Sequence, residues 1–234
     1  MTVKAVFFDA GNTILRLDYA LIVDALKRQG FLVDQEEVWR AECRARVKLD
    51  PFLAEITVRE SPEVFSRYVR YMCEEMGLLW GKKAERLLRE LREINGHSNL
   101  WRGGAVTGAR EVLEDLKGNG YLLGVISNSD GRLETLLNEV GLAEHLSVIV
   151  DSRVVGFEKP DPRIFHWALE RTGVTPDEAV YVGDFYSLDV VGARRVGLDA
   201  ILLDPLDAWP LLDCVKAKDL FEVRSLLPAS PKCR

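Results

Sequence analysis

From residue 103 onward, the sequence alternates between segments with helical spacing of apolar side chains and short apolar segments with the character of strands. The predicted elements are helix 107–118, strand 121–127, helix 133–140, strand 147–151, helix 162–171, strand 179–184, helix 188–196, strand 200–204, a strand-like run at 214–215 and helix 219–227. Each strand is reached from the one before it through a helix, and such crossovers make the strands parallel and place helices on both faces of the sheet. The apolar run 3–8 adds a buried parallel strand near the start of the chain. We predict an α/β fold with a Rossmann-like, doubly wound parallel sheet as its core.

The stretch between the first strand and the alternating region, residues 16–100, has helical periodicity and almost no strand signal. Helix starts are predicted at three good N-terminal caps and helix ends at three glycines: Asp18, Asp34 and Ser61, then Gly30, Gly77 and Gly96. Because the first strand belongs to the same sheet as the later ones, the helical stretch is predicted to be an insertion. The predicted domains are a core of residues 1–15 and 101–234 and a helical unit of residues 16–100, with hinges at 16–18 and 100–104.

The charge balance of the chain argues against two classes of partner. The 234 residues include 31 Lys and Arg and 37 Asp and Glu, which gives a net charge of −6. An acidic protein is a poor non-specific binder of nucleic acid or of an anionic membrane, and no apolar run approaches the roughly 18 residues of a membrane span. The four cysteines form no Cys-x-x-Cys pair, which argues against a zinc site or a disulfide framework and favours reduced thiols in the cytoplasm.

Polar and charged residues follow the predicted strands at their carboxyl ends, where open α/β sheets bind ligands. They are Asp9 after the first strand, Ser127 and Asn128 at the end of strand 121–127, Lys159 one loop after strand 147–151, and Asp184 and Asp189 at and after the end of strand 179–184. Each of these residue types is common in caps and turns, but their joint placement favours one shared site. A carboxylate at a strand end can attack phosphorus, while a lysine and Mg²⁺ neutralise the charge of the transferred group. The pattern therefore indicates phosphoryl transfer.

Four segments resemble the motifs of the haloacid dehalogenase-like superfamily of hydrolases. They are VFFDAGNTIL (6–15), VISNSD (125–130), KPDP (159–162) and GDFYSLD (183–189), in the order and at the spacing of the family. The resemblance covers essentially the whole chain. It implies that residues 16–100 form a helical cap, inserted directly after the first motif, that closes over the site and chooses the substrate.

The resemblance also implies roles for individual residues of these motifs. Asp9 would be the nucleophile that forms an aspartyl-phosphate, and Lys159 would hold the nucleophile and the phosphate together. Thr13, Ser127 and Asn128 would contact the phosphate or the substrate.

Mg²⁺ is the cofactor that the resemblance implies. Asp9, Asp184 and the backbone carbonyl of Gly11 would bind the ion, and Asp189 would lie behind them and orient them.

One position departs from the pattern of the phosphatases in this superfamily. They carry a second aspartate two residues after the nucleophile, which protonates the leaving group and later activates water, and this chain has Gly11 there. Such general acid–base help is typically worth about 10²–10⁴-fold. The acid is missing unless Asp18, Asp130 or a residue of the cap replaces it.

Four interpretations remain open. The favoured one is a Mg²⁺-dependent phosphatase or phosphotransferase for a small phosphorylated metabolite, monomeric or homodimeric, that is slow where the leaving group needs a proton. The second is a catalytically weak or inactive member of the superfamily that binds phosphate. A phosphonate hydrolase needs a cap lysine that forms a Schiff base, and the cap lysines lie in charged helical contexts. A 2-haloacid dehalogenase needs no metal, which the Gly-Asp pair at 183–184 argues against.

Overall fold

The computed structural model describes residues 3–57, 59 and 61–229. Its contacts divide the chain into two compact units, one of Met1–Leu15 with Ala105–Arg234 and one of Arg16–Gly104. Residues 101–104, predicted with the core, group with the helical unit, because the backbone of Arg16 exchanges hydrogen bonds with Gly103 and Gly104. Within the described residues, none of the helices combines the length and the apolar character needed to cross a membrane.

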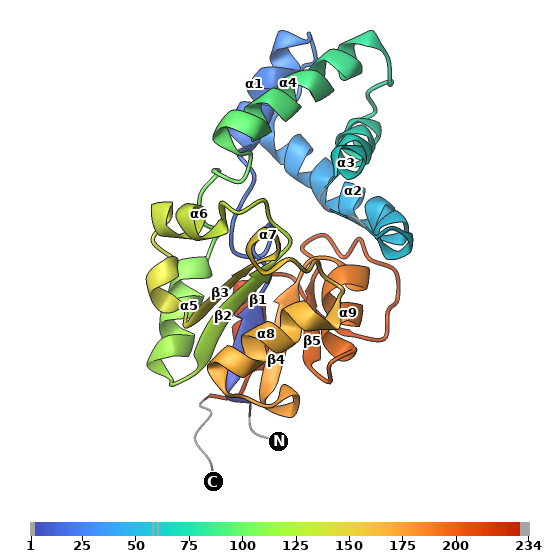
Figure 1. Ribbon diagram of the computed structural model, residues 1–234. Helices are drawn as coiled ribbons and strands as arrows, with labels where there is room; N and C mark the ends of the chain where they lie inside the picture. The colour runs from blue at the N-terminus through green and yellow to red at the C-terminus, as the bar shows by residue number, and fades with distance from the viewer. Residues whose placement is uncertain (1–2, 58, 60, 230–234) are drawn as a thin grey trace. The chain divides into compact units, whose positions relative to one another are not determined.

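The first unit is built on a parallel sheet, which in the described part of the chain has six strands in the order β3-β2-β1-β4-β5-β6 (Figure 1). The strands are β1 (Ala5–Phe8), β2 (Leu122–Ser127), β3 (Val148–Asp151), β4 (Ala179–Gly183), β5 (Asp199–Leu203) and β6 (Val215–Ala217). The central four, β2, β1, β4 and β5, are almost entirely buried, as expected for parallel strands covered on both faces. The predicted α/β fold is confirmed.

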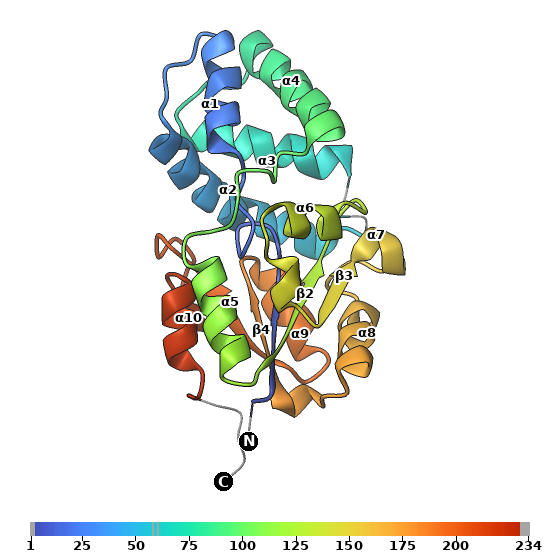
Figure 2. The ribbon, with the colours of Figure 1, turned by 90° about the vertical axis from the view of Figure 1, so that its left-hand side faces the viewer.

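Helices cover both faces of this sheet. They are α5 (Ala109–Gly118), α6 (Leu133–Glu139), α7 (Ser152–Val155), α8 (Pro162–Thr172), α9 (Val191–Arg194) and α10 (Leu220–Leu226). Helices α5 and α10 contact each other on one face, and α8 and α9 contact each other on the opposite face (Figure 2). The prediction of a regular helix over 188–196 was wrong: a π-helical turn, Tyr186–Val190, precedes the short α9.

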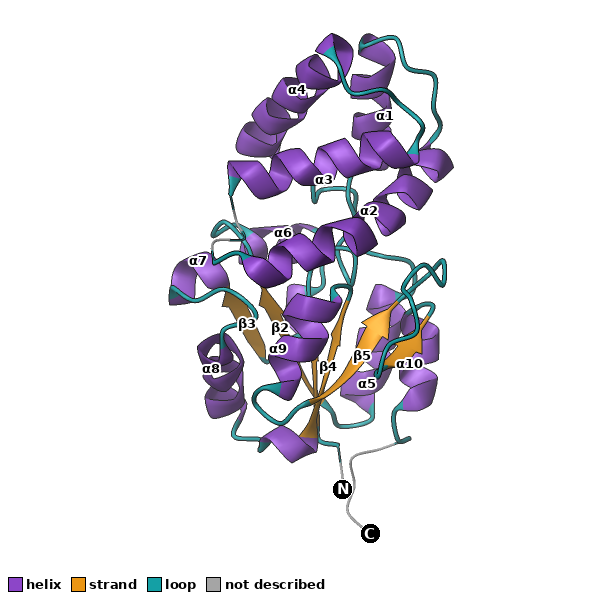
Figure 3. Ribbon diagram, turned by 90° about the vertical axis from the view of Figure 1, so that its right-hand side faces the viewer, coloured by secondary structure: helices purple, strands orange, loops and turns teal. Residues whose placement is uncertain are grey.

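The second unit is a bundle of α1 (Tyr19–Arg28), α2 (Gln35–Glu55), α3 (Pro62–Glu75) and α4 (Lys82–Ser98), shown as purple ribbons in Figure 3. The predicted starts are confirmed, because the side chains of Asp18, Asp34 and Ser61 accept hydrogen bonds from the first turns of α1, α2 and α3. Gly30 and Gly77 follow α1 and α3 with positive φ, as helix-ending glycines do.

The predicted end at Gly96 was wrong. Helix α4 runs on to Ser98 and ends at Asn99, which has a positive φ of 65°. The interior of the unit is an apolar cluster contributed by all four helices. It also contains a buried ion pair on α2, between Glu42 and Arg46.

Candidate active site

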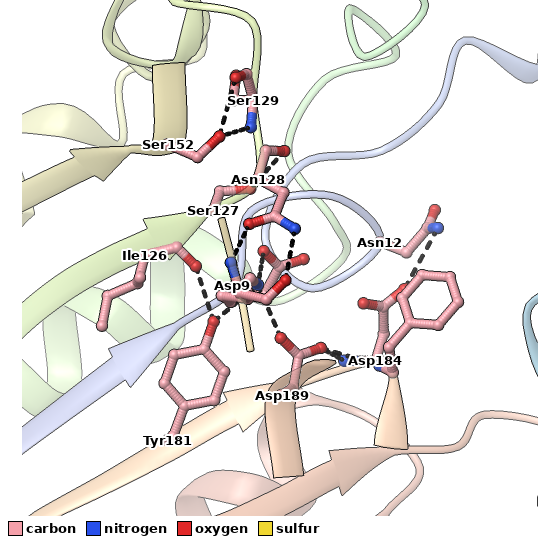
Figure 4. A network of polar contacts seen from close by, with 12 residues as sticks. Asp9, Asn12, Ile126, Ser127, Asn128, Ser129, Ser152, Tyr181, Asp184 and Asp189 are labelled. Atoms are coloured by element: carbon pink, nitrogen blue, oxygen red, sulfur yellow. Dashed lines mark hydrogen bonds and ion pairs between the residues drawn. The ribbon is translucent and has the colours of Figure 1, made fainter. Parts of the chain in front are cut away.

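The carboxyl ends of the central strands bring several of the predicted site residues together, and Figure 4 shows Asp9, Ser127, Asn128, Asp184 and Asp189 there. Asp9 directly follows β1, and Phe8 pairs in register with Val125 of β2 and with Val182 of β4. The chain proceeds from β1 to β2 and β3 on one side and places β4, β5 and β6 on the other, so the direction of the strand order changes beside β1. This is the kind of position at which open α/β sheets bind ligands.

A tight turn follows Asp9. The carbonyl of Ala10 accepts hydrogen bonds from the backbone N–H groups of residues 13–15. Asn12 has φ of 53°, in the left-handed region that asparagine tolerates better than most residues. Its Nδ2 lies 3.5 Å from Oδ2 of Asp184, so the turn brings an amide towards the end of β4.

Thr13, in the same turn, is completely buried. Its hydroxyl has no hydrogen-bond partner among the residues that the structure describes. A buried hydroxyl costs free energy unless it is hydrogen-bonded. The Thr13 hydroxyl is therefore a buried group of this turn whose hydrogen bond is not supplied by the described residues.

Lys159 is at the centre of the site and is 2% exposed. Its Nζ lies 2.6 Å from Oδ1 of Asp9, 2.7 Å from Oδ1 of Asp189 and 2.9 Å from the hydroxyl of Tyr181. An ammonium has three N–H groups to donate, and each has an acceptor here. The lysine thus holds the carboxylate that follows β1 beside the carboxylate of the π-helical turn.

The Gly183-Asp184 pair at the end of β4 is shaped by Asp189. Oδ2 of Asp189 accepts hydrogen bonds from the backbone N–H groups of Asp184 and Phe185, at 3.0 and 2.9 Å. The same carboxylate packs so closely on Gly183 that a Cβ there would come within 2.3 Å of it. Glycine is required before Asp184 for this reason, and the π-helical turn accompanies the bonds that Asp189 makes to the backbone before it.

The end of β2 is tied to the loop that carries Lys159. The side chain of Asn128 accepts a hydrogen bond from the backbone N–H of Lys159 at 2.6 Å and donates one to its carbonyl at 3.1 Å. The Asn128 amide is therefore engaged in holding the lysine loop. Ser127 is buried beside it, with its hydroxyl 3.5 Å from the carbonyl oxygen of Asn128.

Burial and mutual charge set the ionisation of these groups. Burial, helped by the charge of Asp189, raises the pKa of Asp9 against the lowering effect of the Lys159 ammonium. Burial alone would lower the pKa of Lys159, but the charges of Asp189 and Asp9 outweigh it and raise the pKa. Lys159 is therefore an ammonium at neutral pH.

Three carboxylates of the described residues form a group that can hold a metal ion. One oxygen from each of Asp9, Asp184 and Asp189 lies within 4.8 Å of the others, and all three residues are buried. Carboxylate oxygens are the ligands that Mg²⁺ prefers. Because both oxygens of Asp189 already accept hydrogen bonds, Asp9 and Asp184 are the residues best placed to bind a cation.

Comparisons with known proteins agree with this geometry. The profile of the haloacid dehalogenase-like hydrolases matches residues 3–197. The chain belongs to the haloacid dehalogenase-like hydrolase family.

Individual relatives include both curated proteins and solved structures. A haloacid dehalogenase-like hydrolase domain-containing protein 3 of Mus musculus is 41% identical over 125 residues, which is 52% of this chain and 50% of that protein. A phosphoserine phosphatase of Thermus thermophilus is 35% identical over 156 residues, 60% of this chain and 62% of that protein. The chain thus matches only about half to three fifths of the length of these relatives. The crystal structure of a HAD phosphatase from Thermococcus onnurineus has the same fold, with a TM-score of 0.62, 24% identity and coverage of 98% of this chain and 100% of that one.

Two of the residues considered as substitutes for the missing acid at Gly11 are engaged elsewhere. Asp18 caps α1 and accepts a hydrogen bond from the backbone N–H of Leu21. Asp130 pairs with the guanidinium of Arg132, which outweighs the effect of burial and holds the pKa of Asp130 below its usual value. A carboxyl group with a lowered pKa is a poor proton donor at neutral pH. Neither Asp18 nor Asp130 is therefore in a state to replace the acid that is missing at Gly11.

Three residues of the site were not predicted from the sequence. Tyr181 contacts Lys159, and a tyrosine in the otherwise aliphatic β4 was the available signal, because its hydroxyl needs a partner when buried. Asp151, the last residue of β3, accepts hydrogen bonds from the backbone N–H groups of Gly131 and Leu133. The hydroxyl of Ser152 bonds both the N–H and the carbonyl of Ser129. Asp151 and Ser152 thus shape the loop that follows Ser127.

Proposed function

We propose that this hydrolase is a Mg²⁺-dependent phosphatase or phosphotransferase that acts on a small phosphorylated metabolite through an aspartyl-phosphate on Asp9. The observation that carries the proposal is the hydrogen bond of 2.6 Å between the buried Lys159 ammonium and Asp9, at a strand end with two further buried carboxylates. An anion that enters this edge meets a fixed positive charge beside a carboxylate in position to attack it. The relative named as a phosphoserine phosphatase supports this reaction class.

Each residue of the site has a separate role in the proposed phosphoryl transfer. The carboxylate of Asp9 attacks phosphorus, the bond from phosphorus to the leaving oxygen breaks, and that oxygen leaves with the electron pair. Lys159 orients Asp9 through Oδ1 and attracts the phosphoryl oxygens. The hydroxyls of Thr13 and Ser127 donate hydrogen bonds to these oxygens. Water or a second acceptor then attacks the aspartyl-phosphate and restores Asp9.

The carboxylates fit a magnesium ion. Asp9, Asp184 and the carbonyl of Gly11 would hold it, with Asp189 orienting Asp184 through the backbone. When bound, the ion neutralises charge on the transferred group.

Gly11 narrows the substrates that turn over quickly. Glycine offers no proton to a leaving alkoxide, so alkyl phosphates should react slowly, and donors whose leaving group is already a weak base should react faster. We further propose that the helical unit, Arg16–Gly104, acts as the cap that selects the substrate, and that the chain works on a small molecule, as a monomer or homodimer, rather than on nucleic acid or a membrane.

The test is an assay with acetyl phosphate and para-nitrophenyl phosphate, with and without Mg²⁺, together with mass spectrometry of the acid-quenched protein. The proposal expects Mg²⁺-dependent phosphate release and a phosphoryl adduct on Asp9 that Asp9→Asn lacks. If a folded, Mg²⁺-binding wild type gives neither turnover nor adduct, the transfer reaction is wrong, and the absence of an acid at Gly11 favours a phosphate-binding member without catalysis.

A further inference from the structure

A tyrosine hydroxyl completes the hydrogen bonding of the Lys159 ammonium. Tyr181 lies in β4, is fully buried, and packs its ring edge-on against Phe165 of α8, with 5.3 Å between the ring centroids. Its hydroxyl lies 2.9 Å from Nζ of Lys159 and 2.7 Å from the carbonyl oxygen of Ile126. Figure 4 shows this hydroxyl reaching the end of β2, two strands away from β4.

The direction of the two hydrogen bonds follows from the chemistry of the groups. The carbonyl of Ile126 can only accept, so the single proton of the hydroxyl is donated to it. The hydroxyl oxygen then accepts from Lys159, which can only donate. The three acceptors around the ammonium, one hydroxyl and the carboxylates of Asp9 and Asp189, define one orientation for it.

Burial makes this third acceptor hard to replace. Water has little access to Lys159, which is 2% exposed. Without the hydroxyl, one N–H of the ammonium would lose its acceptor in an environment where such a loss is costly. The ammonium would then move towards a new balance between the two carboxylates.

We infer that Tyr181 is a positioning residue that holds the Lys159 ammonium against Asp9 and, through Ile126, fixes it relative to the neighbouring Ser127. Its role in turnover rests on the proposed function, whereas its role in placing the ammonium does not. The hydroxyl touches no reacting atom and acts through the lysine.

Tyr121 provides a matched control, because it makes the same kind of bond away from the site. It is buried and donates a hydrogen bond of 2.7 Å to the carbonyl of Pro228, and it precedes β2, at the end of that strand opposite Ser127. A purely structural role for a buried tyrosine hydroxyl predicts similar effects of Tyr181→Phe and Tyr121→Phe.

The first experiment measures kcat, KM and Tm of the wild type and both variants with acetyl phosphate and Mg²⁺. Tyr181→Phe should lower kcat about tenfold or more with a smaller change in KM, as expected from the loss of one hydrogen bond to a charged group. Tyr121→Phe should keep kcat within about twofold of the wild type, even if its Tm falls as far as the Tm of Tyr181→Phe. A kcat for Tyr181→Phe within twofold of the wild type, or equal losses in both variants, would overturn the role in turnover.

The second experiment needs no turnover. Crystal structures of the wild type and Tyr181→Phe give the distance from Nζ of Lys159 to Oδ1 of Asp9, which is 2.6 Å with the hydroxyl present. The inference expects this distance to exceed hydrogen-bond range, or the lysine to take more than one orientation, in the variant. An unchanged ammonium overturns it. If the wild type hydrolyses no phosphate compound, the proposed function fails, and this measurement still decides the role of Tyr181.

Discussion

Each of the two units buries charged side chains in contact with a tyrosine hydroxyl, but the charges of the two groups are paired differently. In the helical unit, Nε of Arg46 lies 2.8 Å from Oε1 of Glu42 one turn away on α2, and the hydroxyl of Tyr68 donates to the same carboxylate. The Arg46 guanidinium is thus paired directly with the Glu42 carboxylate. In the α/β unit, the single ammonium of Lys159 faces a group of three buried carboxylates.

This difference distinguishes a buried ion pair with a structural role from a buried group of carboxylates that can bind a cation. A matched pair compensates much of its own desolvation, and breaking it leaves an isolated charge. A surplus of buried carboxylates carries a continuing cost in free energy, which a bound cation removes. Three buried carboxylates gathered at one ammonium, rather than burial of charge alone, mark the candidate site in this molecule.

Asp9→Asn removes one of the three buried carboxylates and should have the largest effect on turnover. It should lower kcat by at least about 10³-fold, because an amide cannot attack phosphorus as a carboxylate does. It should change the free energy of unfolding by only about 1 kcal/mol or less, because burial already disfavours the charge of Asp9 and raises its pKa. Phosphate release and urea unfolding measure the two effects. Retained turnover would contradict the nucleophile, and a large loss of stability would contradict the argument from surplus charge.

Arg46→Met tests the matched pair. It should lower the free energy of unfolding by about 3–5 kcal/mol, because Glu42 remains buried without its guanidinium. The double variant Glu42→Leu with Arg46→Met should recover most of this loss, since it removes both charges. Urea unfolding of the single and double variants measures the difference. Equal instability of the two would show that packing, and not charge matching, is what Arg46 contributes.

Gly11→Asp adds a further carboxyl group to the α/β unit. Turnover of alkyl phosphates should rise by about 10²-fold if the missing acid limits the reaction. Gly11→Asn is the control, with a side chain of the same size and no acidic proton. No gain over an already fast wild type would mean that another group supplies the acid.

Mg²⁺ should stabilise the wild type by about 2–3 kcal/mol at roughly 100 times its dissociation constant. Asp184→Asn should lose most of this gain, because one of the carboxylates that bind the ion is neutralised. Arg46→Met should keep the stabilisation by Mg²⁺, since Arg46 and its partner Glu42 lie in the other unit. Thermal unfolding at matched ionic strength measures these shifts. Equal Mg²⁺ stabilisation of Asp184→Asn and the wild type would rule out the proposed ion site.

Local signals account for the features that could be predicted. Asp18, Asp34 and Ser61 start helices as predicted because a cap is a contact between a side chain and the N–H groups two or three residues later. The parallel sheet was equally predictable, since the alternation of helices and strands leaves few ways to bury its strands. Gly96 failed as a helix end because glycine permits a positive φ without requiring one, and the helix continues to Ser98 before Asn99 takes a positive φ.

The sequence by itself determined the family and the polar residues that follow each strand. Both depend on short motifs, whose residues are neighbours along the chain. Only the tertiary structure decided how those ends are connected. Tyr181 bonds Ile126, 55 residues away, and the amide of Asn128 closes on the backbone of Lys159, 31 residues away. Such bonds depend on strand register and on the shape of loops, which no short segment specifies. The structure also decided which acidic residues are matched and which are in surplus, because charge balance exists only between side chains that folding brings together.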